Sequence, residues 1–213
     1  MSKSNIEQGI LKRVNKNYNE VSNFLNPQFE ICSELNTIIY EINTCVLLDL
    51  HKATITLTNY LLERLLKIAL IYNEAGIGPV EDLNDLDNIF KEPNRKYGDI
   101  TLEKSIKKCR EFDLITDDEE CILHERIRKL LRNGFSHADS SKILKDLPDE
   151  YKMFQGSFSN PNEVREVFLN TKINPTFQAL HMTEYATLQA FPYYKFVFNL
   201  IFKIEKRLKE TVN

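Results

Sequence analysis

A short stretch of the chain, RNGFSH from Arg132 to His137, brings an arginine, a small polar residue and a histidine within six positions. Histidine has an ordinary pKa of about 6.5, so His137 can exchange a proton near neutral pH. The guanidinium of Arg132 keeps its charge and can stabilise negative charge. Side chains of these types in one cleft fit acid–base catalysis assisted by a fixed cation.

The spacing of Arg132 and His137 requires a particular backbone path. In an unbroken α-helix, residues five apart are rotated by roughly 140° about the axis, so the two side chains diverge. Asn133 and Gly134 lie between them. Glycine tolerates positive φ and commonly ends a helix, so we expect the chain to bend here and to turn both side chains toward one cleft.

Helices with apolar faces are expected to position this segment. A polar surface helix is predicted within 1–27, a second helix from Phe29 to about Leu50, and a central helix from His51 to Asn73 that is apolar nearly all round. Residues 76–100 are expected to form a polar connector. Thr101 is a predicted helix cap, and Thr116 and Glu119 match a capping box. The helix that this box opens carries apolar residues to Leu131 and is expected to keep Glu119 and other charged residues outside.

The chain after the motif is expected to be irregular. Residues 139–185 contain Pro148, Gly156, Pro161 and Pro175 and are interpreted as an insertion with one short helix around Asn162 to Phe168. A last helix is predicted from about Ala186 to Lys209 despite Pro192. Its aromatic side chains between Phe191 and Phe202 are interpreted as core or dimer interface rather than as a base-stacking surface. The predicted fold is all-α, a bundle of four to five helices forming one domain over 1–213.

Composition narrows the class of protein. Hydrophobic residues make up 42% of the chain and charged residues 28%, which is typical of a globular fold. A net charge of −3 argues against coating of nucleic acid by a wholly basic surface. No apolar run is long enough for a membrane span or a secretory signal, so a cytoplasmic protein is expected. The widely spaced cysteines are expected to be buried free thiols: Cys32, Cys45, Cys109 and Cys121.

With these elements in place, the chain resembles the HEPN family of helical-bundle proteins. The family's defining motif is an arginine separated by four to six residues from a histidine, and Arg132 and His137 match it. Asn133 fills the polar position after the arginine, and Leu61-Leu62-Glu63 on the central helix is similar to a pattern on an earlier family helix. The resemblance covers the helical parts and leaves out residues 139–185.

The resemblance implies a function. Many members are ribonucleases that need no metal or other cofactor and act as homodimers whose two motif copies line one cleft. Some serve as toxins or defence effectors, so the resemblance suggests an antitoxin or a nucleotidyltransferase as a partner. His137 would then take the proton of a ribose 2′-OH or protonate the leaving 5′-oxygen, Arg132 would hold the scissile phosphate, and Asn133 would orient phosphate or ribose. The alternatives are a non-catalytic module that binds a nucleotide, RNA or protein, and a helical scaffold with no nucleic-acid role.

Each of these residues also has an ordinary structural explanation. His137 can bond a carbonyl at a helix end, Arg132 can complement the helix dipole, and Asn133 with Gly134 can form a cap. Further candidates for supporting the site or binding RNA lie nearby or on the central helix, where solvated faces and salt bridges are the more common outcome: Glu63, Arg64, Arg128, Lys129 and Ser136.

Overall fold

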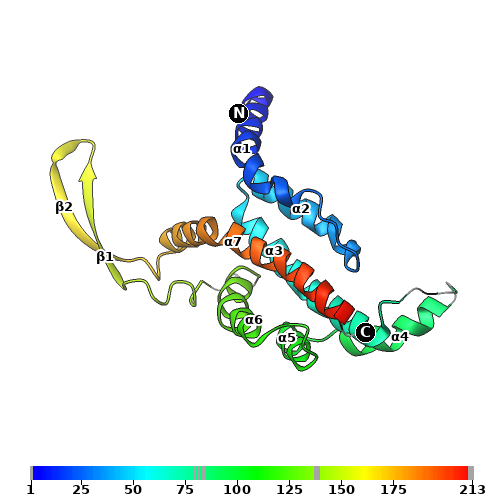
Figure 1. Cartoon of the computed structure of the whole chain (residues 1–213). Helices are drawn as coiled ribbons and strands as arrows, with labels where there is room; N and C mark the ends of the chain where they lie inside the picture. Colours follow the sequence, from blue (N-terminus) through cyan, green and yellow to red (C-terminus); the bar gives the residue numbers. More distant parts are fainter. Residues whose placement is uncertain (1, 79, 81, 83–84, 137–139, 211–213) are drawn as a thin grey trace.

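The computed structural model describes residues 2–78, 80, 82, 85–136 and 140–210, and its α-helices surround one long central pair (Figure 1). The chain begins with α1 (Lys3–Val21) and a short turn η1 (Ser22–Phe24), continues through the turn η2 (Ser33–Leu35), and then forms the following elements in order: α2 (Asn36–Leu47), α3 (His51–Ala75), α4 (Leu86–Tyr97), α5 (Leu102–Glu111), α6 (Asp117–Ile122), the π-helical segment η4 (Leu123–Ser136), β1 (Glu150–Ser157), β2 (Asn160–Asn170) and α7 (Pro175–Glu210).

Helices α3 and α7 run side by side through the centre of the fold (Figure 1). The predicted all-round apolar character of α3 explains its place, because it packs against α2, α4, α5, η4 and α7. Leu61, Leu62, Leu65 and Leu66 are fully buried. Helix α7 has 36 residues and a length of about 54 Å, so it reaches beyond the bundle at one end.

Three aromatic residues of α7, Tyr193, Tyr194 and Phe198, are buried in the core, as their helical spacing predicts. Phe198 contacts the rings of Phe24 and Phe29, with centroids 4.7 and 5.7 Å apart. The hydroxyl of Tyr194 donates to Oδ1 of Asn43 at 2.8 Å, so its polar end is satisfied inside the protein. The segment between Phe191 and Phe202 thus joins α7 to the first part of the chain.

The predicted capping box at the start of α6 is confirmed, but the expected exposure of Glu119 is wrong. The Thr116 side chain accepts from the backbone N–H of Glu119, and the Glu119 carboxylate accepts from the backbone N–H of Thr116. Glu119 is only 5% exposed because Lys203 and Arg207 of α7 reach its carboxylate, at 2.9 and 2.7 Å. The capping-box glutamate of α6 therefore also joins this helix to α7.

Two predicted loops contain regular structure. Helix α4 lies within the expected polar connector and continues through Pro93, packing Pro93 and Tyr97 toward α3. The predicted short helix at 162–168 is wrong, since these residues belong to β2, which pairs with β1 in an antiparallel hairpin that projects from the helices (Figure 1). Tyr151 lies opposite Leu169, and Met153 opposite Val167. Half-buried and exposed side chains alternate along the first part of β1, and this pattern becomes recognisable only once the two strands are paired.

The last helix begins earlier than predicted. Helix α7 starts at Pro175 rather than near Ala186, so the irregular segment is shorter than 139–185. Proline suits the first helical position, where no intrahelical N–H bond is needed. The expectation of buried cysteines holds for Cys32 and Cys109, whose thiol pKa values burial raises, while Cys45 is half-buried and Cys121 is exposed.

Candidate functional site

Three of the candidate residues meet where η4 crosses α3. Nε of Arg132 lies 3.2 Å from Oε1 of Glu63, and the side chains are 30% and 32% exposed. Nη1 of Arg132 also donates to Oδ1 of Asn133 at 3.4 Å. The motif arginine is thereby placed at the surface with a carboxylate on one side and an amide beside it.

Buried neighbours hold both members of this pair. Leu61 and Leu62 are fully buried and fix the face of α3 on which Glu63 emerges. On η4, Ile127 and Leu131 are 3% and 5% exposed, and they leave Arg132 at the edge of the core. An ion pair exposed to this degree is screened by water and contributes at most about 1 kcal/mol to stability. Its main consequence is the orientation of the guanidinium.

The backbone at the motif does not bend as the sequence suggests. The segment η4 is π-helical from Leu123 through Ser136, so Asn133 and Gly134 lie inside a helix and do not end one. A π-helix hydrogen-bonds residues five apart and takes more residues per turn than the 3.6 of an α-helix. Residues five apart are then rotated by less than in an α-helix. Such winding is rare in proteins. Where it occurs, mostly as a single-turn π-bulge, it often lies at a functional site.

His137 lies outside the described residues, as does the side chain of Ser136. Arg132 and Asn133 lie within the described residues, next to Glu63 of α3.

The remaining candidate cations have other neighbours. Arg64 follows Glu63 by one residue, a rotation of about 100°, and so points into a hollow with Glu34 and Glu41. Arg128 pairs with Glu103 of α5 at 2.9 Å, and Lys129 pairs with Glu125 at 2.6 Å. Carboxylates thus lie beside the candidate cations along this surface.

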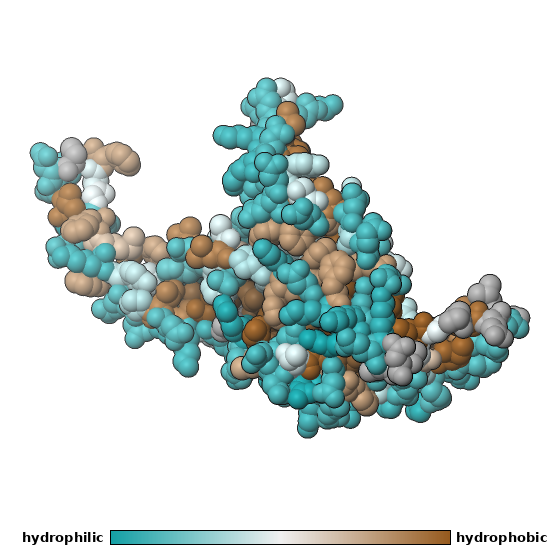
Figure 2. Space-filling view, in the orientation of Figure 1, coloured by the Kyte–Doolittle hydropathy of each residue, from teal (hydrophilic) through white to brown (hydrophobic). Residues whose placement is uncertain are grey.

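An open hollow lies directly beside the motif, between the end of η4, the start of α3 and the start of α7. We call it the η4 hollow. Its volume is about 350 Å³, and its lining includes apolar and polar side chains from all three helices: Lys52, Thr56, Gly134, Phe135, Ser140, Pro175, Gln178, Ala179 and Met182. Around it, exposed apolar residues gather along the first turns of α7, where the hairpin joins the helices (Figure 2).

The sequence contains a signal for part of this hollow. Lys52, Thr56 and Glu63 are four and seven residues apart, spacings that place all three on one face of α3. The α7 wall had no comparable signal, because its first turns follow a hairpin whose pairing is non-local.

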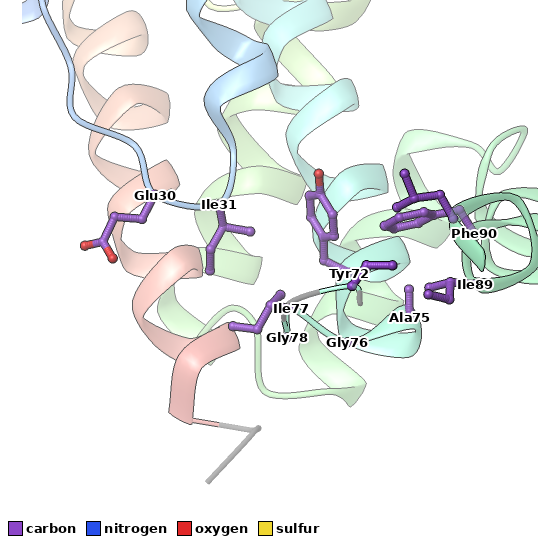
Figure 3. A pocket seen from close by; sticks show the side chains of 11 residues that line it. Glu30, Ile31, Tyr72, Ala75, Gly76, Ile77, Gly78, Ile89 and Phe90 are labelled. Atoms are coloured by element: carbon purple, nitrogen blue, oxygen red, sulfur yellow. The ribbon is translucent and has the colours of Figure 1, made fainter. Parts of the chain in front are cut away.

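A second hollow, of about 470 Å³, lies at the other end of α3 between Tyr72, Ile77 and Phe90 (Figure 3). Its polar side chains are already engaged. Glu30 turns away from the hollow and pairs with Lys209 at 2.5 Å, and the Tyr72 hydroxyl donates to Glu34 at 3.1 Å. Burial and the nearby Glu34 carboxylate raise the pKa of Tyr72 to about 12. The other side chains that line this hollow are apolar.

Models of known protein families, curated protein sequences and solved structures yield no match to this chain. Among the described residues, no group of three or more His, Cys, Asp or Glu side chains is arranged to hold a metal ion. Within the same ranges, no helix combines the length and the apolar character needed to cross a membrane.

Proposed function

We propose that this chain is a metal-independent endoribonuclease of the HEPN type, in which Arg132, Asn133 and His137 act at one phosphate of RNA. The observation that supports this proposal most directly is the ion pair between Arg132 and Glu63. These residues belong to the two separate sequence patterns on which the family resemblance rests. Their contact is what one functional site made from both patterns would require.

The proposed reaction uses the neighbouring ribose as nucleophile. His137 accepts the proton of the 2′-OH or donates one to the leaving 5′-oxygen. The bond from the 2′-oxygen to phosphorus forms while the bond to the 5′-oxygen breaks, which yields a 2′,3′-cyclic phosphate and a 5′-hydroxyl. Arg132 stabilises the negative charge that builds on the phosphoryl oxygens. Glu63 fixes the direction of the guanidinium, and Asn133 orients phosphate or ribose.

The resemblance also bears on assembly and biological setting. We propose a homodimer in which two copies of the motif line a shared cleft, acting in the cytoplasm as a toxin or a defence effector. An antitoxin or a nucleotidyltransferase is then the class of partner to test. A monomer mass by light scattering at concentrations well above micromolar would remove the shared cleft from this proposal.

The decisive experiment compares wild-type protein with His137→Ala on a defined single-stranded RNA in the presence of EDTA. Wild type is expected to release fragments that end in 2′,3′-cyclic phosphate. The folded variant is expected to cleave about 10² to 10⁴ times more slowly, the usual contribution of a general acid or base. Equal rates in the two folded proteins would remove the catalytic assignment and favour the binding module.

A further inference from the structure

We infer that the η4 hollow binds one base of a single-stranded RNA whose backbone lies against Arg132. This inference rests on the proposed function and deepens it, since it assigns a base-binding subsite next to the phosphate. The argument comes from the position of the hollow, the chemistry of its walls and the charge at its rim.

The hollow lies within reach of a nucleotide that neighbours the phosphate held by Arg132. Gly134 and Phe135 line it and directly follow Arg132 and Asn133 in η4. On α3, Thr56 lies on the same face as Glu63 and two turns away, a distance of about 10 Å along the axis. One chain of RNA can therefore contact both places.

The walls suit the flat apolar face of a base. Phe135 lines the hollow, and its ring stacks on Tyr185 at an interplanar angle of 22° with centroids 6.3 Å apart. That contact holds the Phe135 ring in place. Ala179 and Met182 of α7 add apolar surface. Aromatic side chains that accept a stacked base are the usual basis of single-strand recognition, because every base has such a face.

Polar groups in the hollow suit the edge of a base. Gln178 donates its side-chain N–H to the backbone carbonyl of Lys172, which fixes the position of the amide. Because this amide is already held in one position, it can bind the donors and acceptors of a base edge with little further loss of side-chain conformational entropy. Thr56 lines the hollow from α3, and its hydroxyl, which donates to the backbone carbonyl of Lys52 at 3.0 Å, can accept a hydrogen bond from a base.

Lys52 supplies charge at the rim of the hollow. It lies in the first turn of α3, where the helix dipole disfavours a cation and where no acidic residue is present. Within the described part of the chain, Lys52 makes no salt bridge, whereas Arg128 and Lys129 each pair with a carboxylate. A phosphate of bound RNA would compensate the Lys52 charge.

The test separates base binding from cleavage. His137→Ala protein is mixed with a short single-stranded RNA that contains 4-thiouridine, irradiated, and digested for mass spectrometry. A cross-link to the peptide that contains Phe135 or Met182 is the expected result. In parallel, Ala179→Trp fills the hollow, and Leu180→Trp adds the same bulk at a position that is 59% exposed and outside the lining.

We expect Ala179→Trp to weaken binding of the RNA by about tenfold, the scale of one stacked base, and Leu180→Trp to leave it unchanged. Lys52→Gln is expected to reduce the salt dependence of binding by about one phosphate contact, with Lys12→Gln on α1 as control. If RNA is cleaved but Ala179→Trp binds it like wild type, the base-binding subsite is refuted while the proposed function stands. If wild type neither binds nor cleaves RNA, both are refuted.

Discussion

Glu63 and Arg132 are 69 positions apart in the chain, yet Oε1 of one lies 3.2 Å from Nε of the other. Glu63 projects from the central helix α3, and Arg132 lies in the last turns of η4. Because the leucines before Glu63 are fully buried, the carboxylate has little freedom to follow the arginine elsewhere. The pair therefore sets the direction of the one motif cation that the structure describes.

Replacement of Glu63 tests whether this contact serves function more than stability. Glu63→Gln removes the charge and keeps the shape, so the free energy of unfolding should fall by no more than about 1 kcal/mol. RNA cleavage should fall by on the order of tenfold or more, because the guanidinium loses the carboxylate that helps to fix its direction. Chemical denaturation and initial cleavage rates measure the two effects.

The matched control for this variant is Arg64→Gln on the neighbouring, differently directed position of α3. It should leave the cleavage rate close to that of wild type. If Glu63→Gln cleaves RNA as fast as Arg64→Gln does, Glu63 has no role in orienting the site.

Arg132→Lys tests whether the planar fork is required. Lysine keeps the positive charge but provides a point charge in place of the rigid set of donors. We expect a large loss in kcat for RNA cleavage with the fold retained, as judged by circular dichroism and by the thermal midpoint. An activity equal to that of wild type would show that charge alone suffices at this position.

The buried carboxylate of Glu119 should make stability depend on pH. Burial acts to raise its pKa, but hydrogen bonds from Arg207, from the backbone of Thr116 and from Lys203 outweigh burial and lower the pKa from 4.5 to about 2. A carboxyl group with a lowered pKa stabilises the fold above its unfolded pKa. This stabilisation should be lost as pH falls from about 4.5 to about 2.

Glu119→Gln should therefore cost on the order of 3 kcal/mol of unfolding free energy at pH 7. The difference from wild type should shrink as pH falls through that window. Urea unfolding at a series of pH values measures it, with the exposed Glu125→Gln as control. A difference that stays constant from pH 7 to pH 2 would contradict the assigned role of Glu119.

The β-hairpin should be dispensable for the stability of the helices. The strands pair chiefly with each other and project from the helices, although Tyr151 contacts the ring of His181 at the hairpin base. Replacement of residues 152–168 by a short Gly-Ser linker should leave the thermal midpoint within a few degrees of wild type. A cooperative loss of helix signal would show that the hairpin supports the bundle.

Some features of this protein follow from the sequence because they depend on neighbours within one or two turns. The capping box of Thr116 and Glu119 and the continuation of α7 through Pro192 are of this kind. The packing of α3 against several other helices follows in the same way, since a helix that is apolar nearly all round must be covered on most of its sides. The association of Arg132 with Asn133 needs only adjacency in the chain.

Other features depend on contacts between distant segments, and only the tertiary structure decides them. Local pattern marks Glu119 as a capping residue, but its burial depends on Lys203 and Arg207, more than 80 positions away. The strands at 150–170 become recognisable through their pairing, and the α4 helix through its packing on α3. The ion pair of Glu63 with Arg132 and the hollow beside it exist because helix packing brings α3, η4 and α7 together. Short-range periodicity in the sequence does not encode this arrangement.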